Sequence, residues 1–117
     1  MASKKRDGAI AILTTVGRQR QAASIARTLV DEQMAACVNI VGPVRSVYRW
    51  QGAVHDDREF LLVIKTRADR YPVVERRIRE IHPYELPELI AIGVNRGSKP
   101  YLDWLVESSA PARQMKK

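Results

Sequence analysis

The chain has 117 residues, 45% of them hydrophobic and 28% charged, and a formal net charge of +7. That length and composition predict one globular domain and exclude an intrinsically disordered chain. They also predict no membrane association, because no apolar stretch approaches the ~20 residues that a membrane span needs. Cys37 is the only cysteine, which rules out an intramolecular disulfide and favours a reducing compartment, so we expect a cytoplasmic protein.

A positive net charge suggests nucleic-acid binding, but the distribution of the charge argues against it. Five of the seven net positive charges lie in residues 1–8 and 111–117, so the body of the chain is close to balanced. We therefore expect flexible basic tails over residues 1–8 and 110–117, a single domain over residues 9–109, and no nucleic-acid-binding function. Weak polyanion binding by the tails is the alternative.

The elements of the first half follow from hydrophobic periodicity. Residues 9–16 form a short apolar run bounded by glycines, which is typical of a buried central strand. Apolar residues three and four apart predict an amphipathic helix over residues 19–34. Residues 36–41 form the next strand, Gly42-Pro43 bends or bulges it, and residues 44–50 continue extended with alternating character.

The second half begins with a tight turn at Gln51-Gly52, after which residues 53–66 return as a long strand. A second helix is predicted over residues 69–81, with Asp69 as its N-cap. A compact apolar strand follows over residues 89–94. A last helix is predicted from a Ser98 cap to about Glu107.

This order predicts an α+β fold of the ferredoxin-like split β-α-β type (βαββαβ) with a C-terminal helix, in which two helices cover one face of a four-stranded antiparallel sheet with a long central hairpin. The other face would carry Leu61, Val63, Tyr48 and Trp50, and an exposed apolar patch of this kind marks an interaction surface. The hairpin is also longer than its neighbouring strands, so parts of its edges have no strand to pair with. We therefore expect a cyclic oligomer with these four residues at its interface.

The segment from His82 to Glu88 contains two prolines and joins the second helix to the next strand. The prolines fix two φ angles and favour extended conformations at the residues before them. The result is a stiff loop that presents an imidazole, a phenol and two carboxylates. The alternative interpretation is an ordinary connecting loop between a helix and a strand, with no binding role.

A two-residue turn at Gln51-Gly52 would place Tyr48 opposite His55 and Val44 opposite Glu59, on one face of the hairpin. Imidazole and carboxylates suit a borderline divalent cation such as Zn²⁺ or Cu²⁺, so one candidate is a weak metal site between subunits, formed by His82, Glu85 and Glu59. Nothing in the spacing matches a known metal motif. The alternatives are an interface network or a cleft for a small polar ligand, formed by Tyr48, Trp50, Lys65, Tyr84 and Cys37.

Catalytic signals are missing from the sequence. There is no nucleophile elbow, no phosphate-binding glycine loop and no candidate triad, so we expect a non-enzymatic protein. Cys37, between Ala36 and Val38 on a predicted strand, is interpreted first as a small buried side chain.

The chain resembles the CutA family over residues 10–108, through the motifs Ala35–Ile40, Ser46–Gly52, Glu59–Thr66, His82–Ile90 and Tyr101–Leu105. The resemblance implies a cytoplasmic ferredoxin-like subunit in a tight trimer, similar in outline to the PII signalling proteins, and no enzymatic activity. It also implies a link to tolerance of divalent cations, copper in particular.

The sequence departs from this family at two positions of a proposed ligand set. Some bacterial members carry a cysteine after the first strand and paired histidines before the loop proline. Thr14 and Ile81 stand at these positions here, so only His82 remains, which excludes a soft Cu(I) site. Divalent-cation binding and PII-like signalling through a small ligand and a partner protein both stay open.

Overall fold

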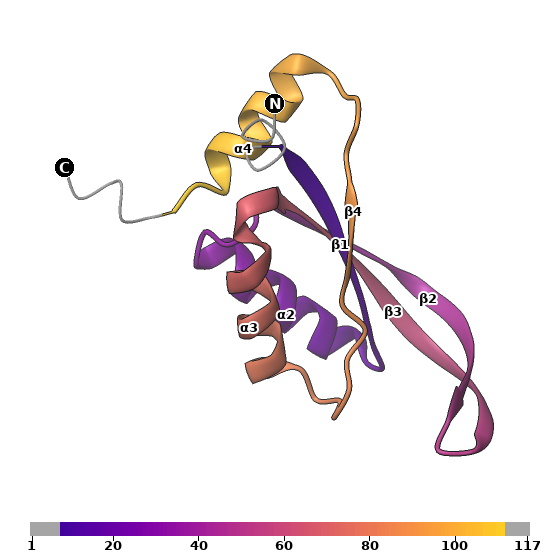
Figure 1. Cartoon of the computed structure of the whole chain (residues 1–117). Helices are drawn as coiled ribbons and strands as arrows, with labels where there is room; N and C mark the ends of the chain where they lie inside the picture. The colour runs from indigo at the N-terminus through magenta and orange to yellow at the C-terminus, as the bar shows by residue number, and fades with distance from the viewer. Residues whose placement is uncertain (1–7, 112–117) are drawn as a thin grey trace.

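The structure, a computed structural model, describes residues 8–111. Within them the chain forms, in order, β1 (Ala9–Val16), α2 (Gln19–Asp31), β2 (Cys37–Trp50), β3 (Ala53–Arg67), a 3₁₀ turn (Ala68–Arg70), α3 (Tyr71–Ile81), β4 (Ile90–Gly93) and α4 (Lys99–Ser108) (Figure 1). The predicted tails fall outside the described residues except at Gly8, Ala110 and Pro111. Among residues 8–111, no helix combines the length and the apolar character that a membrane span requires.

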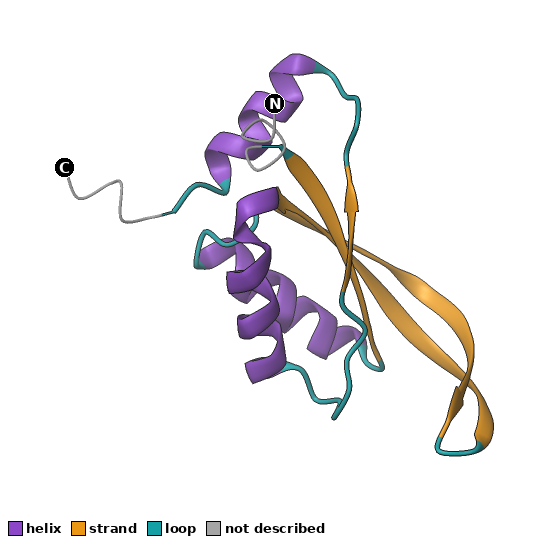
Figure 2. Ribbon diagram, in the orientation of Figure 1, coloured by secondary structure: helices purple, strands orange, loops and turns teal. Residues whose placement is uncertain are grey.

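The strands form one antiparallel sheet in the order β2-β3-β1-β4, which confirms the α+β, ferredoxin-like prediction. α2 and α3 lie on one face of this sheet, and the β2–β3 hairpin projects beyond it (Figure 2). α4 packs against β1 and β3 through Leu105, which is buried. The hairpin therefore carries side chains well outside the helix-covered body.

The core lies between the sheet and the two helices. Alternate residues of β1 and β3 point to the helices, and Ile12 pairs with Ile64 in the register of the two strands. The side chains that fill this layer are all buried: Ile12, Val16, Leu62 and Ile64 from the strands, and Ala22, Ile25, Leu29, Val74 and Ile78 from the helices. An aliphatic core follows from a chain with few aromatic residues.

β2 is one continuous strand, with a bulge at the predicted position Gly42-Pro43. Its register shifts between Val41, which pairs with Leu61, and Val44, which pairs with Glu59. Gly42 is needed in this bulge, because a Cβ atom there would lie 2.6 Å from the ring of Phe60. Glycine thus permits the close approach of the two strands.

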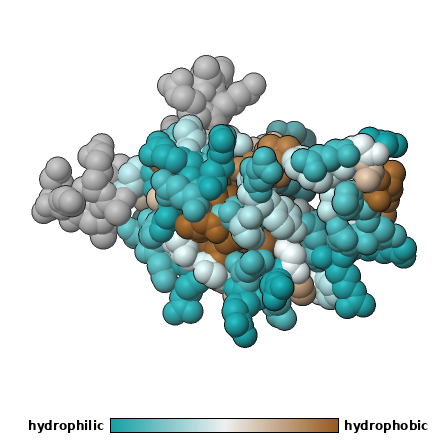
Figure 3. Space-filling view, turned by 90° about the horizontal axis from the view of Figure 1, so that it is seen from below, coloured by the Kyte–Doolittle hydropathy of each residue, from teal (hydrophilic) through white to brown (hydrophobic). Residues whose placement is uncertain are grey.

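The face of the sheet opposite α2 and α3 is apolar and largely uncovered. By strand register it carries the open-face patch, which we define as Val41, Tyr48, Leu61, Val63, Ile90 and Ile92. Ile90 and Ile92 are 51% and 52% exposed, while Leu61 and Val63 are half-buried. A space-filling view from below shows hydrophobic side chains reaching the surface among hydrophilic ones (Figure 3).

Most predicted bounds agree with the structure to within one residue, but two helix boundaries differ by more. α2 ends at Asp31, before the predicted residue 34, because the chain turns at Gln33 with a φ of 61°. Asp69 is not the N-cap of α3: Arg70 holds that position, and the Asp69 carboxylate instead accepts two hydrogen bonds from the Arg67 guanidinium, at 3.0 and 2.7 Å. Ser98 caps α4 as predicted, accepting from the Tyr101 N–H.

Two threonines on the helix-covered face provide a matched stability test. The Thr66 hydroxyl donates to the Met34 carbonyl at 2.8 Å, whereas the Thr14 hydroxyl has no hydrogen-bond partner among residues 8–111. We expect Thr66→Val to lower the free energy of unfolding by ~1–3 kcal/mol, and Thr14→Val to leave it unchanged or raise it. Urea denaturation of both variants measures the difference, and an equal loss in both would contradict the assignment.

Candidate functional site

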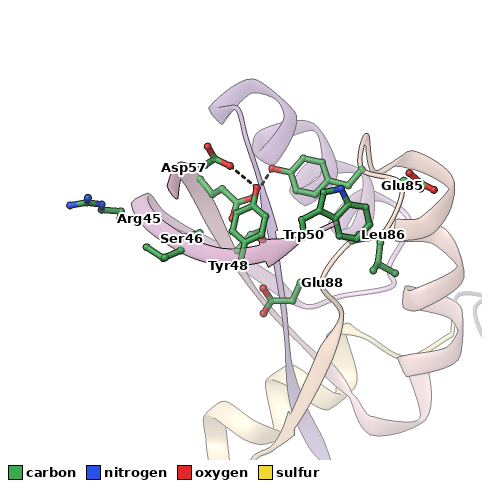
Figure 4. Close-up of a pocket in the computed structure, with 13 residues that line it drawn as sticks. Arg45, Ser46, Tyr48, Trp50, Asp57, Glu85, Leu86 and Glu88 are labelled. Carbon is green, nitrogen blue, oxygen red and sulfur yellow. Dashed lines mark hydrogen bonds between the residues drawn. The ribbon is translucent and has the colours of Figure 1, made fainter. Parts of the chain in front are cut away.

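A pocket of about 1000 Å³ lies between the β2–β3 hairpin and the loop that joins α3 to β4. The hairpin contributes Arg45, Ser46, Val47, Tyr48, Trp50, Asp57 and Glu59, the loop contributes Tyr84, Glu85, Leu86, Pro87 and Glu88, and β1 contributes Thr15. Figure 4 shows the aromatic side chains of the two walls lying close together. A pocket of this size holds a small organic molecule.

The turn of the hairpin fixes which side chains enter the pocket. Gln51 and Gly52 have φ angles of 52° and 82°, as a two-residue hairpin turn requires. The register is the predicted one, with Tyr48 opposite His55 and Val44 opposite Glu59. The predicted face of the hairpin is therefore confirmed.

Tyr48 and Asp57 form the first of two tyrosine–carboxylate pairs. The Tyr48 hydroxyl donates to Asp57 Oδ2 at 2.5 Å, and its ring stacks on His55 at 5.3 Å between centroids. The hydrogen bond to Asp57 raises the pKa of Tyr48 to about 12. The phenol therefore stays protonated at neutral pH and acts as a donor.

Tyr84 and Glu59 form the second pair, and it joins the loop to the hairpin. The Tyr84 hydroxyl donates to Glu59 Oε2 at 2.5 Å. Glu59 is only 6% exposed, although it is charged and sits on a sheet face away from the helices. Burial, and then the bond to Glu59, raise the pKa of Tyr84 above its ordinary value, so this phenol also remains a donor.

His82 anchors the loop to the body of the protein. Its Nε2 lies 2.8 Å from the Thr15 carbonyl and therefore carries a proton, while Nδ1 accepts the Tyr84 N–H at 3.1 Å. The ring is 8% exposed, and burial lowers its pKa below the ordinary value of 6.5. A neutral imidazole thus fixes the position of Tyr84, with both ring nitrogens occupied by backbone groups.

The candidate metal ligands do not form a ready-made metal site. Residues 8–111 contain no group of three or more His, Cys, Asp or Glu side chains placed to hold a metal ion. His82 would have to give up a backbone hydrogen bond to bind one, and Glu85 is exposed, on the opposite side of the pocket from Asp57 (Figure 4). The residues present therefore do not fit a resident metal within one protomer.

The structure places Lys65 and Cys37 elsewhere on the sheet. They face each other across β2 and β3, and neither lines the pocket. The Lys65 ammonium lies 3.4 Å from the Tyr101 hydroxyl and 5.7 Å from the centre of that ring. Cys37 is half-buried, with Sγ 3.7 Å from Asn39 Oδ1. Tyr48, Trp50 and Tyr84 do meet at the pocket.

Sequence reasoning left Asp57 out of the candidate site. Asp57 has the same strand parity as His55 and Glu59, so the hairpin register already placed it on their face. Asp57 belongs to the site because it accepts the hydrogen bond of the Tyr48 hydroxyl. The signal that was missed is this pairing of a tyrosine and an aspartate across two neighbouring strands.

Comparisons with known proteins agree on one family. The family model described as "CutA1 divalent ion tolerance protein" matches residues 10–108. "Divalent-cation tolerance protein CutA" of Thermus thermophilus is 45% identical over 98 residues, which cover 84% of this chain and 95% of that protein. "Protein CutA" of Homo sapiens is 39% identical over 81% of this chain, and the match spans only 53% of that longer protein. The solved "Periplasmic divalent cation tolerance protein CutA from Archaeoglobus fulgidus" is 33% identical with a TM-score of 0.84, over 87% of this chain and 99% of that one.

The lowered pKa of His82 predicts a pH dependence of stability. At a pH between the lowered pKa of His82 in the folded protein and the ordinary pKa of 6.5, the unfolded chain binds a proton that the folded chain does not. The free energy of unfolding therefore falls as the pH falls below about 6.5. Above that pH the contribution is fully present. Urea denaturation between about pH 8 and pH 5 measures the slope in wild type and in His82→Gln, where this component should vanish.

The matched control for this prediction is His55→Gln, because His55 and His82 are the only two histidines. The control keeps His82 and should keep the decline. Parallel pH curves for wild type and His82→Gln would contradict the role given to the buried imidazole.

Proposed function

Because the chain belongs to the CutA1 divalent ion tolerance protein family, we propose that it acts as a non-enzymatic homotrimer whose pocket binds a small-molecule ligand, in the manner of the PII signalling proteins. A partner protein would then bind the form of the trimer that carries the ligand. The observation that carries this proposal is the pair of tyrosine–carboxylate contacts at the pocket. His82 holds the backbone of Tyr84, the tyrosine of the second pair. These groups suit the recognition of a polar organic molecule.

Assembly into an oligomer is supported by the open-face patch. Ile90 and Ile92 are half exposed on β4, which is a short edge strand, and β2 is the opposite edge of the sheet. Apolar side chains and unpaired edges are both covered when copies pack together. The number of three subunits comes from the family resemblance.

A non-enzymatic role is supported by the protonation of the pocket. Both tyrosines have raised pKa values and keep their protons, so they are poor general bases at neutral pH. The His82 imidazole uses both nitrogens to hold backbone groups. Rigid hydrogen bonds of this kind favour binding over proton transfer.

The second candidate function is direct binding of a divalent cation, Cu²⁺ or Zn²⁺, through Glu59, Glu85 and His82. The family description and the carboxylates at the pocket favour it. It requires the His82 ring to leave the Thr15 carbonyl or the Tyr84 N–H, which makes the site weak. We propose the cytoplasm as the compartment because of the single cysteine, although the CutA protein of Archaeoglobus fulgidus is described as periplasmic.

Side-by-side titrations separate the two functions. Cu²⁺, Zn²⁺ and a panel of metabolites are compared by thermal shift and calorimetry on the intact protein and on His82→Ala. We expect a metabolite to raise the unfolding midpoint, as linkage requires of a ligand at ~100 times its dissociation constant. We expect equally weak metal binding by both proteins; tight binding of Cu²⁺ that is lost in His82→Ala would favour the metal function instead.

The proposed interface predicts a loss of association in Trp50→Ala. Trp50 lies on the same sheet face as the open-face patch, and a buried interface tryptophan contributes ~2–4 kcal/mol to association. Val54→Ala is the control, since Val54 is 63% exposed on the opposite face of the hairpin and does not line the pocket. Analytical ultracentrifugation at micromolar concentration measures both, and a monomeric wild-type protein would refute the trimer.

A further inference from the structure

The pocket carries an excess of negative charge. Four carboxylates line it, from Asp57, Glu59, Glu85 and Glu88, against the single guanidinium of Arg45. That guanidinium is already bound to Asp56, with contacts of 2.9 and 2.8 Å, and it points away from the aromatic side chains (Figure 4). Arg45 therefore does not neutralise the carboxylates inside the pocket.

Glu59 is the carboxylate that most needs a cation. It is 94% buried, since only 6% of it is exposed, and no Lys, Arg or His nitrogen forms a salt bridge with it within residues 8–111. Its Oε2 accepts the Tyr84 hydroxyl, and across the described part of the chain no hydrogen bond reaches Oε1, which keeps accessible surface on a residue that lines the pocket. A buried charge without a counter-charge is unfavourable, so the site gains free energy when a cation enters.

The two tyrosines do not remove this charge. Their hydroxyls donate to Asp57 and Glu59. The bond to Asp57 raises the pKa of Tyr48, and burial followed by the bond to Glu59 raises the pKa of Tyr84, while the charges of both carboxylates add to both shifts. Donation from a neutral phenol leaves the carboxylate ionised. Both negative charges therefore lie in one cluster, within electrostatic reach of both rings.

The remaining walls are aromatic and apolar. Tyr48, Trp50 and Tyr84 present rings, and Leu86 and Pro87 present aliphatic groups. Aromatic faces attract organic cations, and apolar walls bind the hydrocarbon that such cations carry. A bare divalent ion would instead need several oxygen ligands gathered around it, and residues 8–111 hold no group of three or more His, Cys, Asp or Glu side chains placed in that way.

We propose that the pocket selects an organic cation, with its ammonium group beside Glu59 and Asp57 and its apolar body against Trp50 and Leu86. This inference rests on the proposed function, because it names the class of ligand for the same pocket. It accounts for the buried charge of Glu59 and for the aromatic walls together.

Three probes that share one ring and differ in charge test the inference: benzylammonium, benzyl alcohol and benzoate. Calorimetry on the intact oligomer near pH 7 should show benzylammonium binding at least ~10-fold more tightly than either of the others, a difference of ~1.4 kcal/mol. Benzoate or benzyl alcohol binding as tightly as benzylammonium overturns the inference, and so does a lack of binding by all three probes. The metabolite thermal-shift screen and the sedimentation measurement judge the proposed function separately, so the two failures are distinguishable.

Matched variants locate the effect. Glu59→Gln keeps an acceptor for Tyr84 but removes the charge, and it should reduce benzylammonium affinity by ~10-fold while leaving benzyl alcohol unchanged. Asp57→Asn serves the same purpose at a more exposed position, should the first variant fold poorly. Glu107→Gln on α4 is the control with the same change of charge away from the pocket, and it should bind benzylammonium like wild type.

A second copy of the chain could supply the missing cation through a lysine or arginine side chain. In that case Glu59→Gln would weaken oligomer association in sedimentation and leave benzylammonium binding unchanged. That result overturns the inference.

Discussion

The bulge at Gly42 and Pro43 is the constraint on which the surface of this protein depends. Two residues of β2 lie there opposite the single Phe60 of β3, so Val41 and Val44 point to the same side of the sheet. Without the extra residue, Tyr48 and Trp50 would point to the helix-covered side instead. One added residue thus puts the aromatic side chains of the hairpin on the same face as the open-face patch and the pocket carboxylates.

The loop after α3 depends on a different kind of contact. His82 lies at the end of the helix and reaches the Thr15 carbonyl at the end of β1, while its second nitrogen holds the Tyr84 N–H. Tyr84 then reaches Glu59 on β3. Three separate parts of the chain are joined through one neutral imidazole and one phenol. Burial of the ring favours this neutral form, which is the form that can accept and donate at once.

Much of the fold could be predicted because its signals are local. The turn at Gln51-Gly52 and strict strand alternation were enough to give the hairpin register correctly. Asp69 was misassigned because Arg67, two residues before it, competes for its carboxylate, and a cap preference does not include such a competitor. Fold class followed from element order, which needs no knowledge of side-chain partners.

The site was harder to predict because its contacts are distant in sequence. His82 and its Thr15 partner are 67 residues apart, so no spacing rule suggested that the imidazole was already committed. Strand parity correctly placed Lys65 on the same face as Glu59 but did not show that it would turn to Tyr101 rather than to the pocket. Parity identifies a face, whereas a site also requires nearness along the strand and across the loop.

The buried carboxylate of Glu59 connects the fold to the function. A glutamine in its place would accept the same hydroxyl from Tyr84 without the free-energy penalty of a buried charge. An uncharged side chain at this position would therefore support folding about as well as glutamate does. What the charge adds is attraction for a cation, and the aromatic walls determine that a cation with an apolar body gains most from entering. The site is thus better suited to its ligand than to the stability of the protein without it.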